Sequence, residues 1–130
     1  MPITLEQAKG MIDKACAKAS EFGVNVGVAV VDDGGHVIAA ARMDGTGFLA
    51  LEMAVGKAFT AAAFRNDTAQ MSKIVGQMPF FANGPEMPGG RLVLMGGGVP
   101  VREGSQVIGA IGVAGASEEQ DVDCALVAIG

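Results

Sequence analysis

The sequence contains no tryptophan, no tyrosine and a single histidine, and only six of its 130 residues are phenylalanine. Half of the residues are nevertheless hydrophobic, and eight are methionine. The core must therefore be built from aliphatic side chains and methionine rather than from aromatic rings. We expect one domain over residues 1–130, because a chain of this length can bury one core and is too short for two.

Positive charge is also scarce, with nine lysine and arginine residues scattered along the chain and a net charge of −5. Nucleic acids and anionic membranes bind proteins through clustered cations, so we expect neither as a partner. No apolar run approaches the roughly 20 residues of a membrane span. The opening residues, MPITLEQAKG, lack the basic and apolar regions of a signal peptide. The sequence therefore predicts a cytoplasmic protein.

Metal-ligating and redox residues are few. Cys16 and Cys124 have no CxxC spacing, and we interpret both as small core residues. A single histidine cannot form the usual multi-histidine metal site within one chain.

The large hydrophobic fraction has a different consequence, because apolar side chains are left over for the surface of so small a domain. Apolar surface patches often mark interfaces, so we expect a homo-oligomer.

Apolar periodicity and turn residues predict four helices and five strands. Thr4 and Gln7 have the spacing of a capping box, and Gly23 is a typical residue to follow the end of the first helix. The expected elements are a helix over 4–22, strands over 24–32 and 36–42, a helix over 48–64, a short helix from 67 or 68, three strands within 91–115 and a helix from 117. Strands joined by tight turns pair antiparallel, which predicts an α+β fold. The strand over 24–32 is apolar on both sides, so helices or another subunit should cover both faces of the sheet.

Charged residues at the junction between the hairpin and the second helix are the first candidates for a site. Turn chemistry explains residues 33–35 in VVDDGGHVIAAARMDGTG, but it does not explain Arg42 and Asp44. Loops often hold binding groups against a rigid scaffold, so these two residues either contact a ligand or form a local salt bridge. Lys57 lies among apolar residues in a helix, and it either extends to solvent or reaches a ligand carboxylate.

Three consecutive glycines, Gly96, Gly97 and Gly98, are the next candidates for ligand binding. Each costs roughly 0.5 to 1 kcal/mol relative to alanine in regular structure. Such a run is expected where the backbone lies flat against a ligand or another subunit, although a bulged strand end would also explain it. The loop over 76–90 is apolar enough to form part of a slot, to which Phe80 and Phe81 would contribute.

His36 follows the hairpin turn directly and is the only imidazole in the chain. At the start of a strand, a histidine is commonly an exposed or hydrogen-bonded strand residue; the alternative is a catalyst or a ligand. Any Ser-His or Cys-His chemistry would have to use this residue.

Three blocks of the sequence resemble one known family. VAVVDDGGHVIAAARMDG, EMAVGKAFTA and GGGVPVREGSQVIGAIGVAGASEEQD are similar, in this order, to blocks of the GlcG/HbpS family, whose domain also forms the C-terminal part of PduO-type proteins. The resemblance implies a profilin-like α/β/α sandwich with a five-stranded antiparallel sheet, and a homo-oligomer. It also implies binding of heme or a related tetrapyrrole, because some members bind heme and the domain is described as heme-binding or heme-degrading. Other members belong to catabolic operons.

The resemblance leaves the iron ligand open. Heme-binding members of the family carry the ligand histidine in the region of the first helix, and residues 4–22 contain no histidine here. The alternatives are Met11, Cys16 and His36, the last from a neighbouring subunit.

A second function is a cofactor-free isomerase or hydratase that moves a proton on a small carboxylated catabolite. Lys57 and Arg42 would hold the carboxylate. His36, Asp44 or Glu52 would transfer the proton, because general acid–base catalysis needs only a positioned group of suitable pKa.

Overall fold

The structure, a computed structural model, describes residues 1–75 and 92–130, which form four helices and four strands. In chain order these are α1 (Leu5–Phe22), β1 (Gly27–Asp32), β2 (Val37–Arg42), α2 (Phe48–Phe64), α3 (Thr68–Val75), β3 (Gly98–Glu103), β4 (Gln106–Ala114) and α4 (Glu118–Ile129). Phe80 and Phe81, predicted to line a ligand slot, lie outside the described residues. The described part of the chain contains no helix long and apolar enough to cross a membrane.

The helix ends agree with the prediction from local sequence. Thr4 caps α1 in a capping box with Gln7, and Gly23 follows the helix with a φ of +74°. Ser117 and Gln120 form the same reciprocal hydrogen bonds at the start of α4. Each cap satisfies backbone groups that a helix end leaves without a partner, so these boundaries are determined by the few residues around them.

The strands form one antiparallel sheet in the order β2-β1-β4-β3. β1 pairs with both β2 and β4, and Val30 lies opposite Ile111 in the register of the central pair.

The antiparallel α+β fold is confirmed, but the prediction of five strands is wrong for the described residues. Residues 92–95 are not a strand, because backbone amides in this segment and directly after it donate to helix side chains instead of to a strand. The amide of Val93 donates to Thr60 Oγ1 at 2.9 Å, and that of Gly96 donates to Glu118 Oε1 at 3.1 Å.

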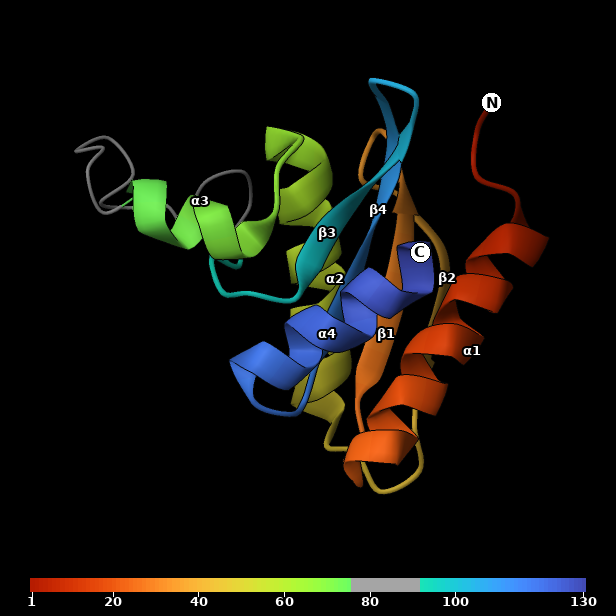
Figure 1. Cartoon of the computed structure of the whole chain (residues 1–130), viewed down its shortest axis with the longest axis vertical. Helices are drawn as coiled ribbons and strands as arrows, with labels where there is room; N and C mark the ends of the chain where they lie inside the picture. The colour runs from red at the N-terminus through yellow and green to blue at the C-terminus, as the bar shows by residue number, and fades with distance from the viewer. Residues whose placement is uncertain (76–91) are drawn as a thin grey trace.

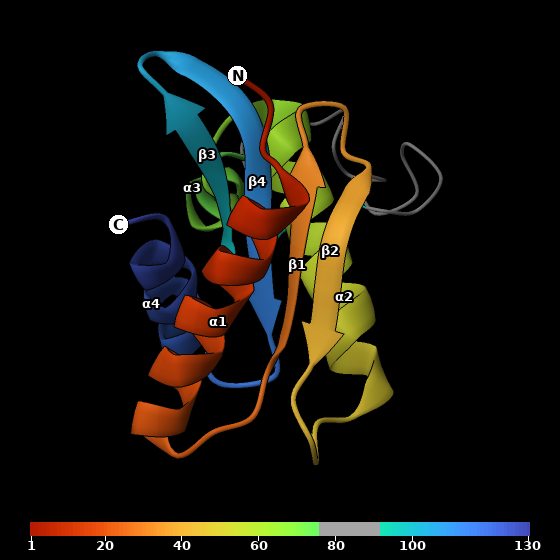
Figure 2. The same cartoon turned by 90° about the vertical axis from the view of Figure 1, so that its right-hand side faces the viewer.

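Helices cover both faces of the sheet, as Figures 1 and 2 show: α2 lies behind the strands in the first view, and α1 and α4 lie in front. Alternate residues of β1 face the two layers. Val28 and Val30 belong to the core under α1 and α4, whereas Ala29 and Val31 pack under α2. The expected covering of a strand that is apolar on both sides is therefore supplied by helices of the same chain.

The layer under α2 is built from small residues, and this lets the helix lie close to the sheet. A Cβ added to Gly112 would press into the carbonyl oxygen of Ala54, and one added to Gly27 would lie 2.9 Å from Leu51 Cα. The glycines of this sheet thus allow backbone-to-backbone approach of a helix.

The opposite layer contains both cysteines. Cys124 is fully buried, and Cys16 packs against the same core between α1 and α4. Burial raises the pKa of the Cys124 thiol to about 11, so this group stays protonated and unreactive at neutral pH. Cys124 is a core residue, as expected, and Cys16 is a partly buried residue at the edge of the same core.

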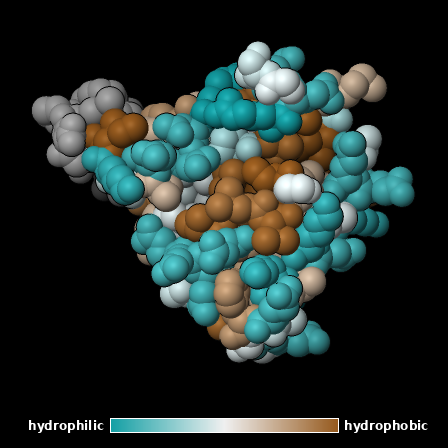
Figure 3. Space-filling view, viewed as in Figure 1, coloured by the Kyte–Doolittle hydropathy of each residue, from teal (hydrophilic) through white to brown (hydrophobic). Residues whose placement is uncertain are grey.

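Apolar side chains remain on the surface. Figure 3 shows a hydrophobic area in the middle of the face that carries α1 and α4. The exposed large hydrophobic residues of the described chain include Leu5, Val37, Phe48, Leu49, Met95, Leu126, Val127 and Ile129. This is the apolar excess expected from composition, and the homo-oligomer inferred from it stays a prediction.

Replacing Gly112 by alanine tests the close approach of α2. We expect Gly112→Ala to lower the free energy of unfolding by about 1–3 kcal/mol, because the added methyl group forces the helix away from the sheet. Urea unfolding followed by circular dichroism measures the change. The matched control is Gly10→Ala in α1, where an added Cβ meets nothing within 4 Å. This control should gain up to about 1 kcal/mol. A Gly112→Ala variant as stable as the parent chain would contradict the packing described.

Candidate functional site

Two of the candidate residues, His36 and Glu52, line the same cavity, which has a volume of about 460 Å³. The cavity lies between the β1–β2 turn, the start of the edge strand β2 and one face of α2. Its wall is mostly apolar and consists of Gly35, Val37, Val55, Gly56, Phe59 and Val93. The residues from α2 share one face of the helix, because their spacing of three and four residues brings them into line.

The β1–β2 turn positions His36 at the mouth of this cavity. Asp32 Oδ1 accepts hydrogen bonds from the amides of Gly34 and His36, both at 2.9 Å. The same oxygen lies 3.4 Å from His36 Nδ1, and the imidazole is 83% exposed. The backbone hydrogen bond from His36 is the main reason that the pKa of Asp32 falls below its ordinary value. Asp32 is therefore a carboxylate at neutral pH.

Gly35 joins the turn to α2. Its φ is +82°, and a Cβ added there would lie 2.7 Å from Cδ2 of Phe59. A larger residue would suffer both an unfavourable backbone conformation and a collision with the phenyl ring. The glycine predicted from turn chemistry thus also places the turn against the helix that forms the cavity wall.

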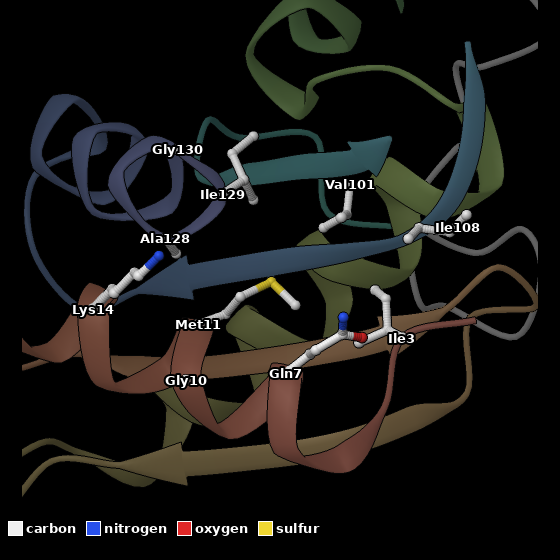
Figure 4. Close-up of a pocket in the computed structure, with 10 residues that line it drawn as sticks. All are labelled: Ile3, Gln7, Gly10, Met11, Lys14, Val101, Ile108, Ala128, Ile129 and Gly130. Atoms are coloured by element: carbon white, nitrogen blue, oxygen red, sulfur yellow. The ribbon is translucent and has the colours of Figure 1, made fainter. Parts of the chain in front are cut away.

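A second apolar cavity, of about 360 Å³, lies between α1, α4 and the β3–β4 pair (Figure 4). The thioether of Met11 points into it, and Ile3, Val101 and Ile108 form its walls. Met11, one of the candidate iron ligands on the first helix, therefore faces a cavity.

Lys57 does not extend to solvent, which was one of the two interpretations of its sequence context. Its side chain is only 2% exposed. Nζ donates to the carbonyl oxygen of Val113 at 3.0 Å and to Asp121 Oδ2 at 3.2 Å. The carboxylate that this lysine reaches belongs to α4 of its own chain. Sequence reasoning did not identify Asp121 as the partner, and the acidic start of the last helix was the available signal.

The glycine run lies flat against helices of the same chain. Gly97 has a φ of +128°, and a Cβ there would lie 3.0 Å from Lys57 Nζ. Its carbonyl oxygen accepts from the amide of Val113 at 2.9 Å. The amide of Gly98 donates to Thr68 Oγ1 at 2.9 Å. Close internal packing, together with the bond from Gly96 to α4, accounts for all three glycines.

Arg42 and Asp44 are exposed residues at the far end of β2 from His36. Arg42 lies six positions after His36 along extended chain, a distance of roughly 20 Å. No ion pair joins Arg42 to Asp44 in the part of the chain that the structure describes. Lys57 is buried beside β4, so the structure does not bring it together with Arg42 as a clamp for a carboxylate.

The comparisons with known proteins agree with this architecture. Residues 3–130 match the family described as haem degrading protein HbpS-like. The chain belongs to the HbpS-like family. The resemblance inferred from the three sequence blocks is therefore confirmed, and the family's matched region covers the sheet, all four described helices and both cavities.

Three relatives illustrate the family. GlcG of Escherichia coli is 34% identical over 112 residues, which are 85% of this chain and 80% of GlcG. The crystal structure of a PduOC:heme complex has a TM-score of 0.90 and 29% identity, and the match covers 99% of this chain and 94% of that one. A double mutant of Streptomyces reticuli HbpS also has a TM-score of 0.90, with 32% identity over 99% of this chain and 86% of that one.

Removing the cation from the buried ion pair should destabilise the fold strongly. We expect Lys57→Met to cost about 3–5 kcal/mol of unfolding free energy, because it leaves the Asp121 carboxylate buried without a partner. The double variant with Asp121→Asn should recover part of this loss, since the amide keeps an acceptor for the Ala116 amide that Asp121 now binds at 3.1 Å. Urea unfolding measures the unfolding free energy of the single and the double variant.

Lys9→Met, which removes an exposed lysine from α1, is the control and should change stability by less than about 0.5 kcal/mol. A Lys57→Met variant no weaker than this control would refute the role of the pair.

The loss in Lys57→Met should also depend on pH. Burial raises the pKa of the Asp121 carboxyl above its ordinary value of 3.8, and Lys57 opposes that rise. Without Lys57 the pKa in the folded chain rises further. A carboxyl with a higher pKa in the folded state binds its proton more tightly there, so stability is gained as pH falls toward the unfolded value. The deficit of Lys57→Met relative to the parent chain should therefore shrink between pH 7 and pH 5. The double variant has no carboxyl at position 121, so it lacks this gain and its deficit should not shrink over the same range.

Proposed function

We propose that this chain binds heme or a related tetrapyrrole in the cavity between the β1–β2 turn and α2. One observation of this structure carries the proposal: the single imidazole of the sequence lines an apolar cavity. The relatives support it, because the PduOC structure is a heme complex and the family is described as haem degrading.

The residues present fit such a group. Protein-bound heme iron is held by histidine, methionine, cysteine or tyrosine side chains. His36 offers an imidazole, and Val55, Phe59 and Val93 offer an apolar wall. The volume of about 460 Å³ lies within the usual range for small-molecule pockets. The cavity between α1 and α4 is smaller, and its candidate ligand is the thioether of Met11.

Each part of the cavity has a distinct role in this proposal. His36 would hold the iron through its ring. Val55, Phe59 and Val93 would cover apolar surface of the macrocycle and exclude water from it. The acidic groups of the ligand would remain in solvent, because no lysine or arginine lines the cavity among the described residues. When bound, heme supplies a redox-active iron.

Titration with hemin tests the proposal. The parent chain should bind hemin saturably, with a shift of the Soret band. His36→Ala should weaken binding and remove the shift that arises from imidazole ligation, whereas Met11→Leu should bind as the parent chain does. Circular dichroism of each variant checks that the fold is kept.

The other outcomes distinguish the remaining sites. If the parent chain binds no hemin saturably, the proposed function is wrong. If Met11→Leu removes the spectral shift and His36→Ala leaves it unchanged, the ligand sits between α1 and α4 instead. Binding that neither substitution alters would exclude both side chains as iron ligands.

A further inference from the structure

The carboxylate of Asp32 is fixed by the hairpin itself. One of its oxygens accepts from two backbone amides, those of Gly34 and His36, and also faces His36 Nδ1 at 3.4 Å. The turn closes around it through two further backbone bonds, from the amide of Asp32 to the carbonyl of His36 and from Gly35 to the carbonyl of Asp32. The carboxylate therefore has its position before any ligand arrives.

The imidazole ring lies against the same turn, with Nδ1 3.4 Å from Asp32 Oδ1. A Cβ added to Gly34 would lie 3.1 Å from both Nδ1 and Cε1 of His36, so this edge of the ring lies over the glycine. A side chain at position 34 would have to displace the ring by a few tenths of an ångström. Among the described residues, Nε2 has no hydrogen-bond partner. In the tautomer that carries its proton on Nδ1, the lone pair of Nε2 is available to a ligand.

We propose that Asp32 is a positioning residue for a ligand bound through His36, fixing the ring and strengthening Nε2 as a donor to iron. This inference rests on the proposed function, because it concerns the same cavity. It assigns a role to a residue that would not touch the ligand itself.

Two effects follow from a carboxylate behind a ligating histidine. It fixes the tautomer and orientation of the ring, and it raises the basicity of the opposite nitrogen. Loss of such an outer partner typically weakens binding by about 10–100-fold. A more basic imidazole also stabilises ferric iron over ferrous iron, so loss of the carboxylate should raise the reduction potential of the bound heme.

Asp32→Asn separates these effects from the turn. The amide oxygen of asparagine can still accept from the amides of Gly34 and His36, so the hairpin is kept while the charge is lost. We expect about 10–100-fold weaker hemin binding, a retained Soret shift at saturation, and a higher reduction potential. Asp33→Asn is the matched control, since it removes the same charge from the neighbouring exposed residue. It should leave affinity and potential unchanged.

Gly34→Ala provides an independent test if Asp32→Asn does not fold. The added methyl group displaces the ring of His36 but leaves the carboxylates of Asp32 and Asp33 in place. Hemin binding should therefore weaken. If Asp32→Asn folds and binds hemin with the affinity and potential of the parent chain, the positioning role is wrong. The loss in His36→Ala would then still support the proposed function. Failure of the parent chain to bind hemin would overturn both.

Discussion

The close contact between α2 and the sheet is the constraint on which the rest of the molecule depends. Small residues on this side of β1 and β4 let the helix backbone approach the strands, and at Gly112 there is no room even for a methyl group. The position of every side chain on α2 follows from this approach. Lys57 lies at the end of β4, where it donates to the Val113 carbonyl, and Phe59 lies against the β1–β2 turn.

The first result of this placement is a buried ion pair between helices on opposite faces of the sheet. Lys57 of α2 reaches Asp121 of α4, and the glycine segment at 96–98 fits against the lysine and the start of α4. A buried pair of this kind is weak evidence for net stability, because both charges lose their hydration. Its clearer consequence is geometric, since an alternative position of either helix would leave a buried charge without its partner.

The second result is the cavity at the edge of the sheet. The same helix that supplies Lys57 to the interior supplies Glu52, Val55 and Phe59 to the cavity wall. The hairpin turn closes the other side and holds His36 there through Asp32. The proposed site thus combines a rigid helix with a tight turn, and each element has a structural reason for its conformation apart from any ligand.

The sequence by itself determined the local elements and the family. Capping residues around Thr4 and Ser117, the turn at 33–35 and the apolar helices are encoded by neighbours a few residues apart, so they could be predicted. The three sequence blocks identified the family by their resemblance to it, and that resemblance implied the fold. The prediction of five strands was wrong at residues 92–95, since side chains of α2 and α4 accept hydrogen bonds from the amides of Val93 and Gly96.

Only the tertiary structure decided which candidate residues meet. Lys57 and Asp121 are 64 positions apart, and no local pattern pairs them. His36 and Glu52 share a cavity, whereas Arg42 and Asp44 lie at the other end of the edge strand. The reason is physical: caps and turns depend on contacts within a few residues, but burial of a charge and the lining of a cavity depend on how close a helix can approach a sheet.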